Sequence, residues 1–259
     1  MDTPTALVNY HVHKPERQAF HIDAGGVTGN LVSPELANTE VPLSDLRANA
    51  VAVSFVKDSV AFARHASGIR DFGEDRAWLC AYDAELTELL STEIGAKEVI
   101  IFDHTVRIDD PNAARKPARN VHSDYSPDGA QKRLEDLVGD QADDWRSGHF
   151  GFVNVWRPIE APINSAPLGF VRPSTVAPED WITLDLIYPD RMGQIMGLVA
   201  NVDHEWLYQS RMTPDEVAIF NIFDSNGKPS IAHSALDRIE DPSITVARKS
   251  IETRTLVRY

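Results

Sequence analysis

The segment 121–126 presents an imidazole and a carboxylate two positions apart, at His122 and Asp124. In an extended segment the side chains of residues i and i+2 point to the same side, so both can reach one metal ion. A histidine from elsewhere in the chain would complete a 2-His-1-carboxylate face with open coordination positions, which is typical of non-haem Fe(II) oxygen chemistry. The pattern alone is weak evidence, because His21 and Asp23 have the same spacing.

The surroundings of the two pairs favour the later one. Three glycines follow Asp23 within six residues. Their spacing fits neither a dinucleotide-binding nor a phosphate-binding loop, so we interpret His21 and Asp23 as loop residues. His11 and His13 could also share a metal, but no carboxylate follows them nearby. We interpret these two histidines as a half-exposed pair on a strand over 5–13.

The later pair has a defined setting. A polar loop over 109–120 precedes it, and Ser126 and Pro127 follow it. Serine as N-cap and proline at the first helical position are typical of a helix start. We therefore expect His122 and Asp124 on a short extended piece that runs into a helix at the rim of a pocket.

His233 is our candidate for the remaining histidine ligand. It lies in a short β-like run after the turn 225–227, where a lone histidine is more often a buried core residue. The next strand favours the ligand, because Arg248 and Ser250 on it point to the same side. A guanidinium binds a carboxylate through two parallel hydrogen bonds, and the hydroxyl adds another donor.

This pair of side chains suits the distal carboxylate of 2-oxoglutarate, whose keto-acid end would bind the iron. Arg254 and Arg258 could serve the same purpose. The pairing with Ser250 favours Arg248 as the anchor of this cosubstrate.

Asn154 is a further candidate for binding the cosubstrate. It lies between Phe152 and Trp156 on one face of a predicted strand over 150–157. A buried amide must find hydrogen-bond partners, so we expect Asn154 to contact a bound ligand. A neighbouring loop would satisfy the amide as well.

The substrate side has three candidates, Arg107, Tyr125 and Trp156. Arg107 follows a buried strand predicted over 98–103, and the polar residues at the end of that strand would line a pocket or form a solvated ion pair. Plain packing is the alternative for Tyr125 and Trp156. Two other histidines, at 149 and 204, are interpreted as surface or core residues.

The elements that must position these residues are mostly strands. Short strands bounded by turn signals follow one another in the second half of the chain, which indicates an antiparallel sandwich or barrel. A helix is predicted from Asp83 to Gly95, with leucines at helical spacing. We expect residues 31–50 to be irregular and 51–55 to form a strand. The segment 158–180 carries too many prolines to be regular throughout.

Composition excludes several classes of protein. The formal charge of −14 argues against nucleic acid or an anionic membrane surface as partner. The 42% of hydrophobic residues suffices for a core. Cys80 is the only cysteine, so the chain cannot hold an internal disulfide or a thiolate-rich metal site. Without a secretory signal or an apolar stretch long enough to cross a bilayer, we expect a cytoplasmic protein.

The chain resembles the Fe(II)/2-oxoglutarate-dependent oxygenases. Within them it is similar to the family of the 7α-cephem methoxylase component and the fungal hydroxylase/desaturases, which includes gibberellin desaturases. The resemblance extends from about residue 50 onward. It is carried by seven segments: 101–107, 122–127, 154–158, 185–191, 212–217, 223–225 and 248–254.

The resemblance implies a mainly β fold with flanking helices around a double-stranded β-helix, or jelly-roll, core of the cupin type. It implies a single domain over 1–259, in which 1–97 flank a core formed by 98–259. It also implies Fe(II) on His122, Asp124 and His233, with O₂ and 2-oxoglutarate as cosubstrates, the latter on Arg248 and Ser250. The reaction would be hydroxylation or desaturation of a small molecule, in secondary metabolism.

Two other functions remain open from the sequence. One is an iron oxidase that takes no 2-oxoacid, in which Arg248 grips a carboxylate of the substrate. The other is a non-catalytic, cupin-like accessory subunit of a tailoring system. The sequence also leaves open a homo-oligomer or an accessory enzyme as partner.

Overall fold

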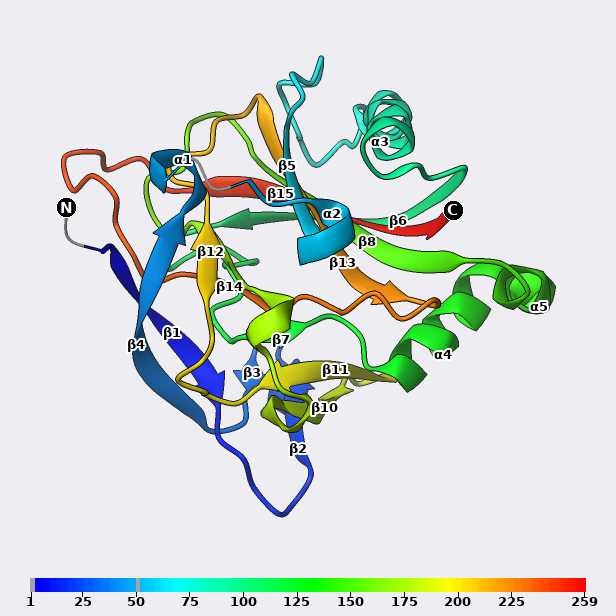
Figure 1. Cartoon of the computed structure of the whole chain (residues 1–259), viewed down its shortest axis with the longest axis horizontal. Helices are drawn as coiled ribbons and strands as arrows, with labels where there is room; N and C mark the ends of the chain where they lie inside the picture. Colours follow the sequence, from blue (N-terminus) through cyan, green and yellow to red (C-terminus); the bar gives the residue numbers. More distant parts are fainter. Residues whose placement is uncertain (1–2, 50–51) are drawn as a thin grey trace.

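The computed structural model describes residues 3–49 and 52–259. Within them two β-sheets face each other, and helices cover the outer face of one sheet and one side of the molecule (Figure 1). The larger sheet has ten strands. In order across it they are β1 (Thr5–His11), β4 (Leu36–Asp45), β12 (Trp206–Tyr208), β9 (Leu168–Val171), β14 (His233–Ala235), β7 (His122–Ser123), β11 (Met192–Leu198), β10 (Trp181–Ile187), β2 (Gln18–Ile22) and β3 (Leu31–Val32).

The smaller sheet has five strands. In order across it they are β5 (Val60–Arg64), β13 (Glu216–Asp224), β8 (Phe150–Pro158), β15 (Lys249–Arg258) and β6 (Glu98–Ile108). Residues 1–97 supply the outer strands on both sides of the larger sheet and one edge strand, β5, of the smaller sheet, whose other edge strand is β6. Later residues supply all the inner strands. Two curled sheets of this kind form the expected jelly-roll fold, which is confirmed by the match to solved structures given below.

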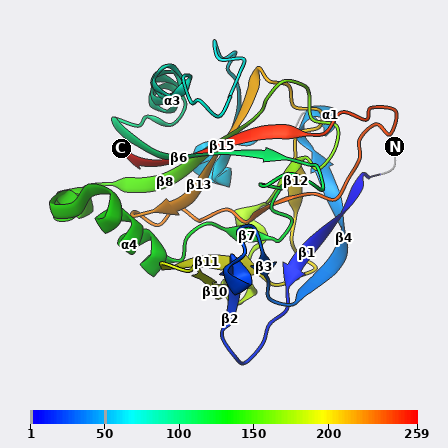
Figure 2. The same cartoon turned by 180° about the vertical axis from the view of Figure 1, so that it is seen from behind.

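The helices are few and mostly short. They are α1 (Leu46–Asn49), α2 (Phe55–Asp58), α3 (Leu79–Ile94), α4 (Pro127–Val138) and α5 (Ala142–Arg146), with single 3₁₀ turns at Ala24–Gly26, Gly139–Gln141, Pro173–Thr175 and Pro178–Asp180. Seen from behind, α3 lies over the five-stranded sheet, and α4 runs from the end of that sheet toward β11 (Figure 2).

The alternation of β8 shows how the chain buries both faces of the smaller sheet. Phe152 and Trp156 point between the two sheets, where they pack with aromatic residues of β9 and β13. Val153 and Val155 point outward and pack beneath Leu86 and the other leucines of α3. A strand buried on both faces explains why this segment carries so few charged residues.

The predicted start of α4 and the predicted end of α3 are correct. Ser126 is the N-cap of α4, and its hydroxyl accepts a hydrogen bond from the main-chain N–H of Gly129 at 2.9 Å. Gly95 ends α3 with a left-handed φ of 73°. The start of α3 lies earlier than predicted, after Trp78 rather than at Asp83.

Four predictions of local structure were wrong. The strand predicted over 5–13 ends at His11, which is buried rather than half-exposed, and His13 lies beyond it. The irregular segment predicted over 31–50 contains β4, whose polar sequence is held extended by pairing with β1 and β12. Instead of a strand over 51–55, residues 52–54 are irregular and α2 begins at Phe55, capped by the Ser54 hydroxyl; residue 51 lies outside the described residues. His21 belongs to strand β2 rather than to a loop, although its side chain is exposed.

Candidate metal centre and cavity

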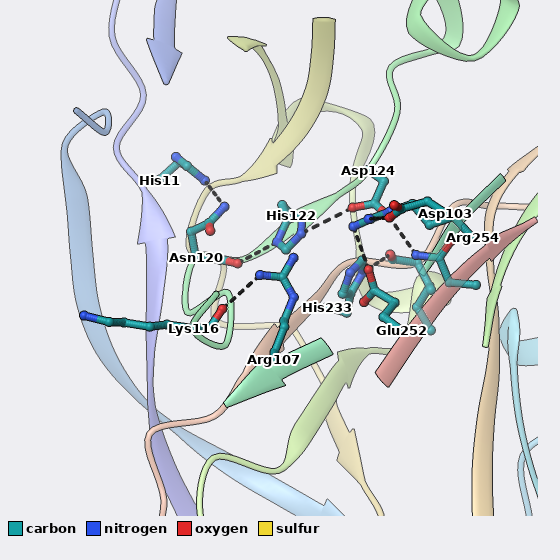
Figure 3. A network of polar contacts seen from close by, with 12 residues as sticks. His11, Asp103, Arg107, Lys116, Asn120, His122, Asp124, His233, Glu252 and Arg254 are labelled. Atoms are coloured by element: carbon teal, nitrogen blue, oxygen red, sulfur yellow. Dashed lines mark hydrogen bonds and ion pairs between the residues drawn. The ribbon is translucent and has the colours of Figure 1, made fainter. Parts of the chain in front are cut away.

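The ten-stranded sheet brings His122 and His233 side by side. They lie directly opposite each other in the pairing of β7 with β14, and their ring centroids are 4.5 Å apart. Asp124 follows β7 by one residue. The ligand atoms that these three side chains offer all lie within 4.8 Å of one another. Figure 3 shows His122 and Asp124 on one segment of the chain and His233 on another, with the three side chains converging.

Main-chain oxygens orient both imidazoles. Nδ1 of His122 is 2.8 Å from the Asn120 carbonyl oxygen, and Nδ1 of His233 is 3.3 Å from that of Ile231. With Nδ1–H donating to a carbonyl, each ring presents the lone pair of Nε2 toward the common centre. This tautomer is the one that a metal ligand requires.

The Asp124 carboxylate is held through one of its two oxygens. Its Oδ2 accepts hydrogen bonds from the Asn154 amide at 2.7 Å and from Nε of Arg254 at 3.1 Å. Its Oδ1 lies 3.5 Å from Nε2 of His122, facing the centre between the histidines. Burial by itself raises the pKa of Asp124, but the charge of the adjacent Arg254 guanidinium holds that pKa well below its usual range. The carboxyl is therefore ionised and free to bind a cation through Oδ1.

Arg254 holds the Asp124 carboxylate, a role that was not predicted from the sequence, where Arg254 was considered only as an anchor for 2-oxoglutarate. Besides Asp124, its guanidinium forms ion pairs with Asp103 at 2.7 Å and with Glu252 at 2.6 Å. The spacing could have indicated that Arg254 faces the site. Residues 248, 250, 252 and 254 share one face of a strand, and the anchor for 2-oxoglutarate, Arg248 with Ser250, was predicted on that face. With three carboxylates around it, Arg254 is already neutralised.

Two buried histidines, His233 of the centre and His11 of β1, are neutral. Burial, with the nearby charge of His122, lowers the pKa of His233 to about 3. The same two causes lower the pKa of His11, which lies next to Asn120, to about 4. Neutral imidazole is the form that binds metal, so His233 is competent as a ligand over the whole physiological pH range.

Arg248 is a buried guanidinium that forms no ion pair with the described residues. It is only 3% exposed, and no carboxylate of the described residues lies within ion-pairing distance. It donates to the Ser250 hydroxyl at 3.0 Å and to the Ala166 carbonyl at 2.7 Å, and its Nε has no partner. Burial, with the nearby charge of Arg107, lowers its pKa to about 9. A buried cation of this kind fits an anionic ligand, which would supply the missing charge.

An open cavity of about 910 Å³ reaches the candidate metal centre. His122 and Asp124 lie on its wall together with two of the predicted substrate residues, Arg107 and Tyr125. The third, Trp156, is 1% exposed and lies outside the wall, with the Arg248 guanidinium 5.1 Å from its ring centroid.

The remaining candidates take other places. The Asn154 amide donates a hydrogen bond to Asp124, one of the three proposed metal ligands. His104 points away from the cavity and binds Asp83 and Thr253. His204 is buried between Asp180 and Tyr10, and His149 is half-buried beside Asp224.

The sequence and the fold are those of an oxygenase family. Residues 8–258 match the family model described as an oxidoreductase/YMDC permease-like domain, and the chain belongs to this family. Its relatives are fungal Fe(II)/2-oxoglutarate-dependent dioxygenases and hydroxylase/desaturases, so the resemblance to these enzymes is confirmed.

Two curated relatives are informative. The hydroxylase/desaturase EfuI of Hormonema carpetanum is 32% identical over 255 residues, covering 85% of this chain and 84% of the relative. The Fe(II)/2-oxoglutarate-dependent dioxygenase NvfI of Aspergillus novofumigatus is 28% identical over 261 residues, covering 96% and 82%.

A solved structure of the iron- and α-ketoglutarate-dependent endoperoxidase NvfI superposes with a TM-score of 0.89 at 24% identity, covering 100% of this chain and 99% of that one. This likeness establishes the fold. No helix among the described residues is long and apolar enough to cross a membrane.

Proposed function

We propose that this chain is a non-haem Fe(II)- and 2-oxoglutarate-dependent dioxygenase that hydroxylates or desaturates a small molecule of secondary metabolism. The observation that carries the proposal is the geometry of His122, Asp124 and His233, whose free ligand atoms lie within 4.8 Å of one another. Two imidazoles and one carboxylate are the donor set that suits Fe(II) in oxygen chemistry. Fe(II) bound there, with 2-oxoglutarate and O₂, supplies the oxidising power to break an unactivated C–H bond.

The residues of the chain position the reactants and exclude water. Asn154 and Arg254 keep the Asp124 carboxylate turned with Oδ1 toward the histidines. We assign the distal carboxylate of 2-oxoglutarate to Arg248 and Ser250. The Arg248 guanidinium is buried, donates to the Ser250 hydroxyl and forms no ion pair with a carboxylate of the described residues. Trp156 packs against that guanidinium and so supports the anchor.

Arg107 and Tyr125 line the same cavity as His122 and Asp124 and are proposed to contact the substrate. Arg107 has one hydrogen-bond partner, the Lys116 carbonyl at 2.9 Å, and no carboxylate of the described residues within ion-pairing distance. Tyr125 packs on Phe152, with ring centroids 5.0 Å apart, and burial raises its pKa to about 12. Tyr125 therefore presents a neutral hydroxyl.

The test is an anaerobic titration of the purified chain with Fe(II) and then with 2-oxoglutarate, followed by a succinate assay in air. The proposal expects a weak visible charge-transfer band that needs both additions, and slow succinate formation. A band without dependence on 2-oxoglutarate would favour an iron oxidase that takes no 2-oxoacid. Neither a band nor thermal stabilisation by either addition would favour an accessory subunit.

We also propose that the protein works in the cytoplasm, alone, as a homo-oligomer or with an accessory enzyme. Cys80, its only cysteine, is exposed and free, which suits a reducing compartment. Fractionation of the producing cells and sedimentation of the purified chain test these points.

A further inference from the structure

Apart from Asp128, a carboxylate without an ion pair among the described residues, the charged residues on the cavity wall fall into two groups. One group is matched in ion pairs: Arg254 with Asp103 and Asp124, Lys132 with Asp136, Asp185 with Arg17, and Arg191 with Asp190. These pairs leave little charge for a ligand to meet. The second group consists of guanidiniums that have no carboxylate of the described residues within ion-pairing distance.

This second group comprises Arg107, Arg115 and Arg133. The chain as a whole has 39 acidic and 25 basic residues, so carboxylates are plentiful on its surface. Three guanidiniums on one cavity wall nevertheless have none. Arg107 lies opposite Ser250, a residue of the proposed cosubstrate anchor, in the pairing of β6 with β15. Arg115 and Arg133 therefore remain as candidates for binding a second anionic group in the cavity.

Arg133 is the better placed of these two. It projects from α4, is half-buried, and stacks with its guanidinium carbon 4.7 Å from the centroid of the Phe102 ring. Stacking fixes the plane of a guanidinium and leaves its edge of N–H donors free to bind a carboxylate through two hydrogen bonds. Arg115 is exposed on the loop before β7 and adds positive charge on the same cavity.

Another part of the cavity wall is apolar. Phe20 and Ile22 of β2, Leu186 of β10 and Ile195 of β11 line it. They belong to one hydrophobic cluster of the ten-stranded sheet. A molecule in this cavity therefore meets apolar side chains from one sheet and arginines from α4 and the loop over 109–120.

We infer that the substrate is an amphipathic anion, with an apolar body against β2, β10 and β11 and a carboxylate or similar anionic group on Arg133. This inference rests on the proposed function for the reaction, but the binding it describes can be measured without turnover. The guanidinium of Arg133 orients the molecule by its charged end, so its apolar part extends along the cavity that reaches His122 and Asp124.

The experiment uses 8-anilinonaphthalene-1-sulfonate, a fluorescent amphipathic anion, with the full chain loaded with Mn(II) and 2-oxoglutarate. The probe is expected to bind the wild-type chain and to bind Arg133→Gln on the order of tenfold more weakly, as loss of one charged hydrogen-bonding partner predicts. Lys132→Gln is the matched control, because Lys132 lies beside Arg133 on α4 and lines the same cavity but is paired with Asp136. Its affinity for the probe should stay within about twofold of wild type.

Competition separates charge from hydrophobicity. Octanoate should displace the probe from the wild-type chain at concentrations on the order of tenfold lower than octan-1-ol, and this advantage should disappear in Arg133→Gln. Absence of probe binding to the wild-type chain, equal competition by the acid and the alcohol, or an equal effect of both substitutions would overturn the inference. A missing charge-transfer band with intact probe binding would instead count against the proposed oxygenase activity alone.

Discussion

Nε of Arg254 lies 3.1 Å from Oδ2 of Asp124, the oxygen that faces away from the two histidines. Together with the Asn154 amide, this contact leaves only Oδ1 turned toward the centre. Outer contacts of this kind orient metal ligands and commonly change metal affinity by about 10–100-fold. Arg254 is itself fixed by Asp103 and Glu252, so the carboxylate is held by a rigid network.

The first prediction follows from this network. Arg254→Lys keeps the positive charge but cannot donate to three carboxylates in fixed directions, so Mn(II) affinity measured by calorimetry should fall about tenfold or more. The fold should persist, as judged by circular dichroism. Lys249→Gln is the control on the same strand, since Lys249 is paired with Glu160 at the surface. Equal Mn(II) affinity in the lysine variant and wild type would show that Arg254 does not orient Asp124.

A second prediction concerns the cosubstrate anchor. Arg248→Lys loses the guanidinium fork, and the half-saturating concentration of 2-oxoglutarate in the charge-transfer titration should rise by about 10–100-fold, the equivalent of about 1.4–2.8 kcal/mol. Fe(II) binding should stay unchanged, because Arg248 contacts Ser250 and Ala166 rather than the three proposed ligands. Ser250→Ala should weaken 2-oxoglutarate binding to a smaller extent. If Arg254→Lys shifted the 2-oxoglutarate titration more than Arg248→Lys did, the anchor would be misassigned.

The third prediction is a pH dependence of the metal-free chain. The pKa of His233 is about 3 and that of His11 about 4 in the folded state, against 6.5 for an ordinary histidine. Below pH 6.5 the unfolded chain therefore binds protons that the folded chain does not, and stability falls as the pH falls. Between pH 6.5 and 5 each group should cost on the order of 2 kcal/mol. The lowered pKa of Asp124 contributes stability above the carboxyl's ordinary pKa, so its loss belongs to a lower range of pH.

Urea denaturation in EDTA at pH 7.5, 6.5 and 5.0 measures this effect. His233→Asn removes one of the two groups, so its stability should depend less steeply on pH than that of wild type. His21→Ala is the control, since His21 is exposed. A wild-type stability that did not change between pH 6.5 and 5 would contradict neutral, buried histidines at the centre.

Metal binding gives a fourth prediction. Mn(II) at about 100 times its dissociation constant should raise the free energy of unfolding of the wild-type chain by about 2.7 kcal/mol, seen as a higher Tm. His122→Ala, Asp124→Ala and His233→Ala should each lose this stabilisation and all turnover, whereas His21→Ala should keep both. Full activity in Asp124→Ala would rule out the proposed ligand set.

Local signals in the sequence predicted those parts of the structure that depend on neighbouring residues. Ser126 before Pro127 gave the start of α4, and leucine spacing gave the body of α3. Strand β4 could not be found this way, because its residues are polar and only pairing with β1 and β12 makes them a strand. At 51–55 a short apolar run predicted a strand, but Ser54 is the N-cap of a helix that begins at Phe55.

At the site, spacing within one strand was informative and contacts between strands were not. The spacing of His122 and Asp124 placed both beside the cavity. The meeting of His122 with His233 depends on the register of β7 with β14, which no local pattern encodes. The contact of Arg254 with Asp124 likewise joins β15 to the segment after β7. This contact depends on how the two sheets pack against each other, which the sequence alone does not specify.

The most direct test of the central claim is a crystal structure of the chain grown with Mn(II) and 2-oxoglutarate, with the metal located by anomalous scattering. The account predicts one strong peak within bonding distance of Nε2 of His122, Oδ1 of Asp124 and Nε2 of His233, with the distal carboxylate of 2-oxoglutarate on Arg248. A metal bound elsewhere, or one that His233 does not reach, would contradict it.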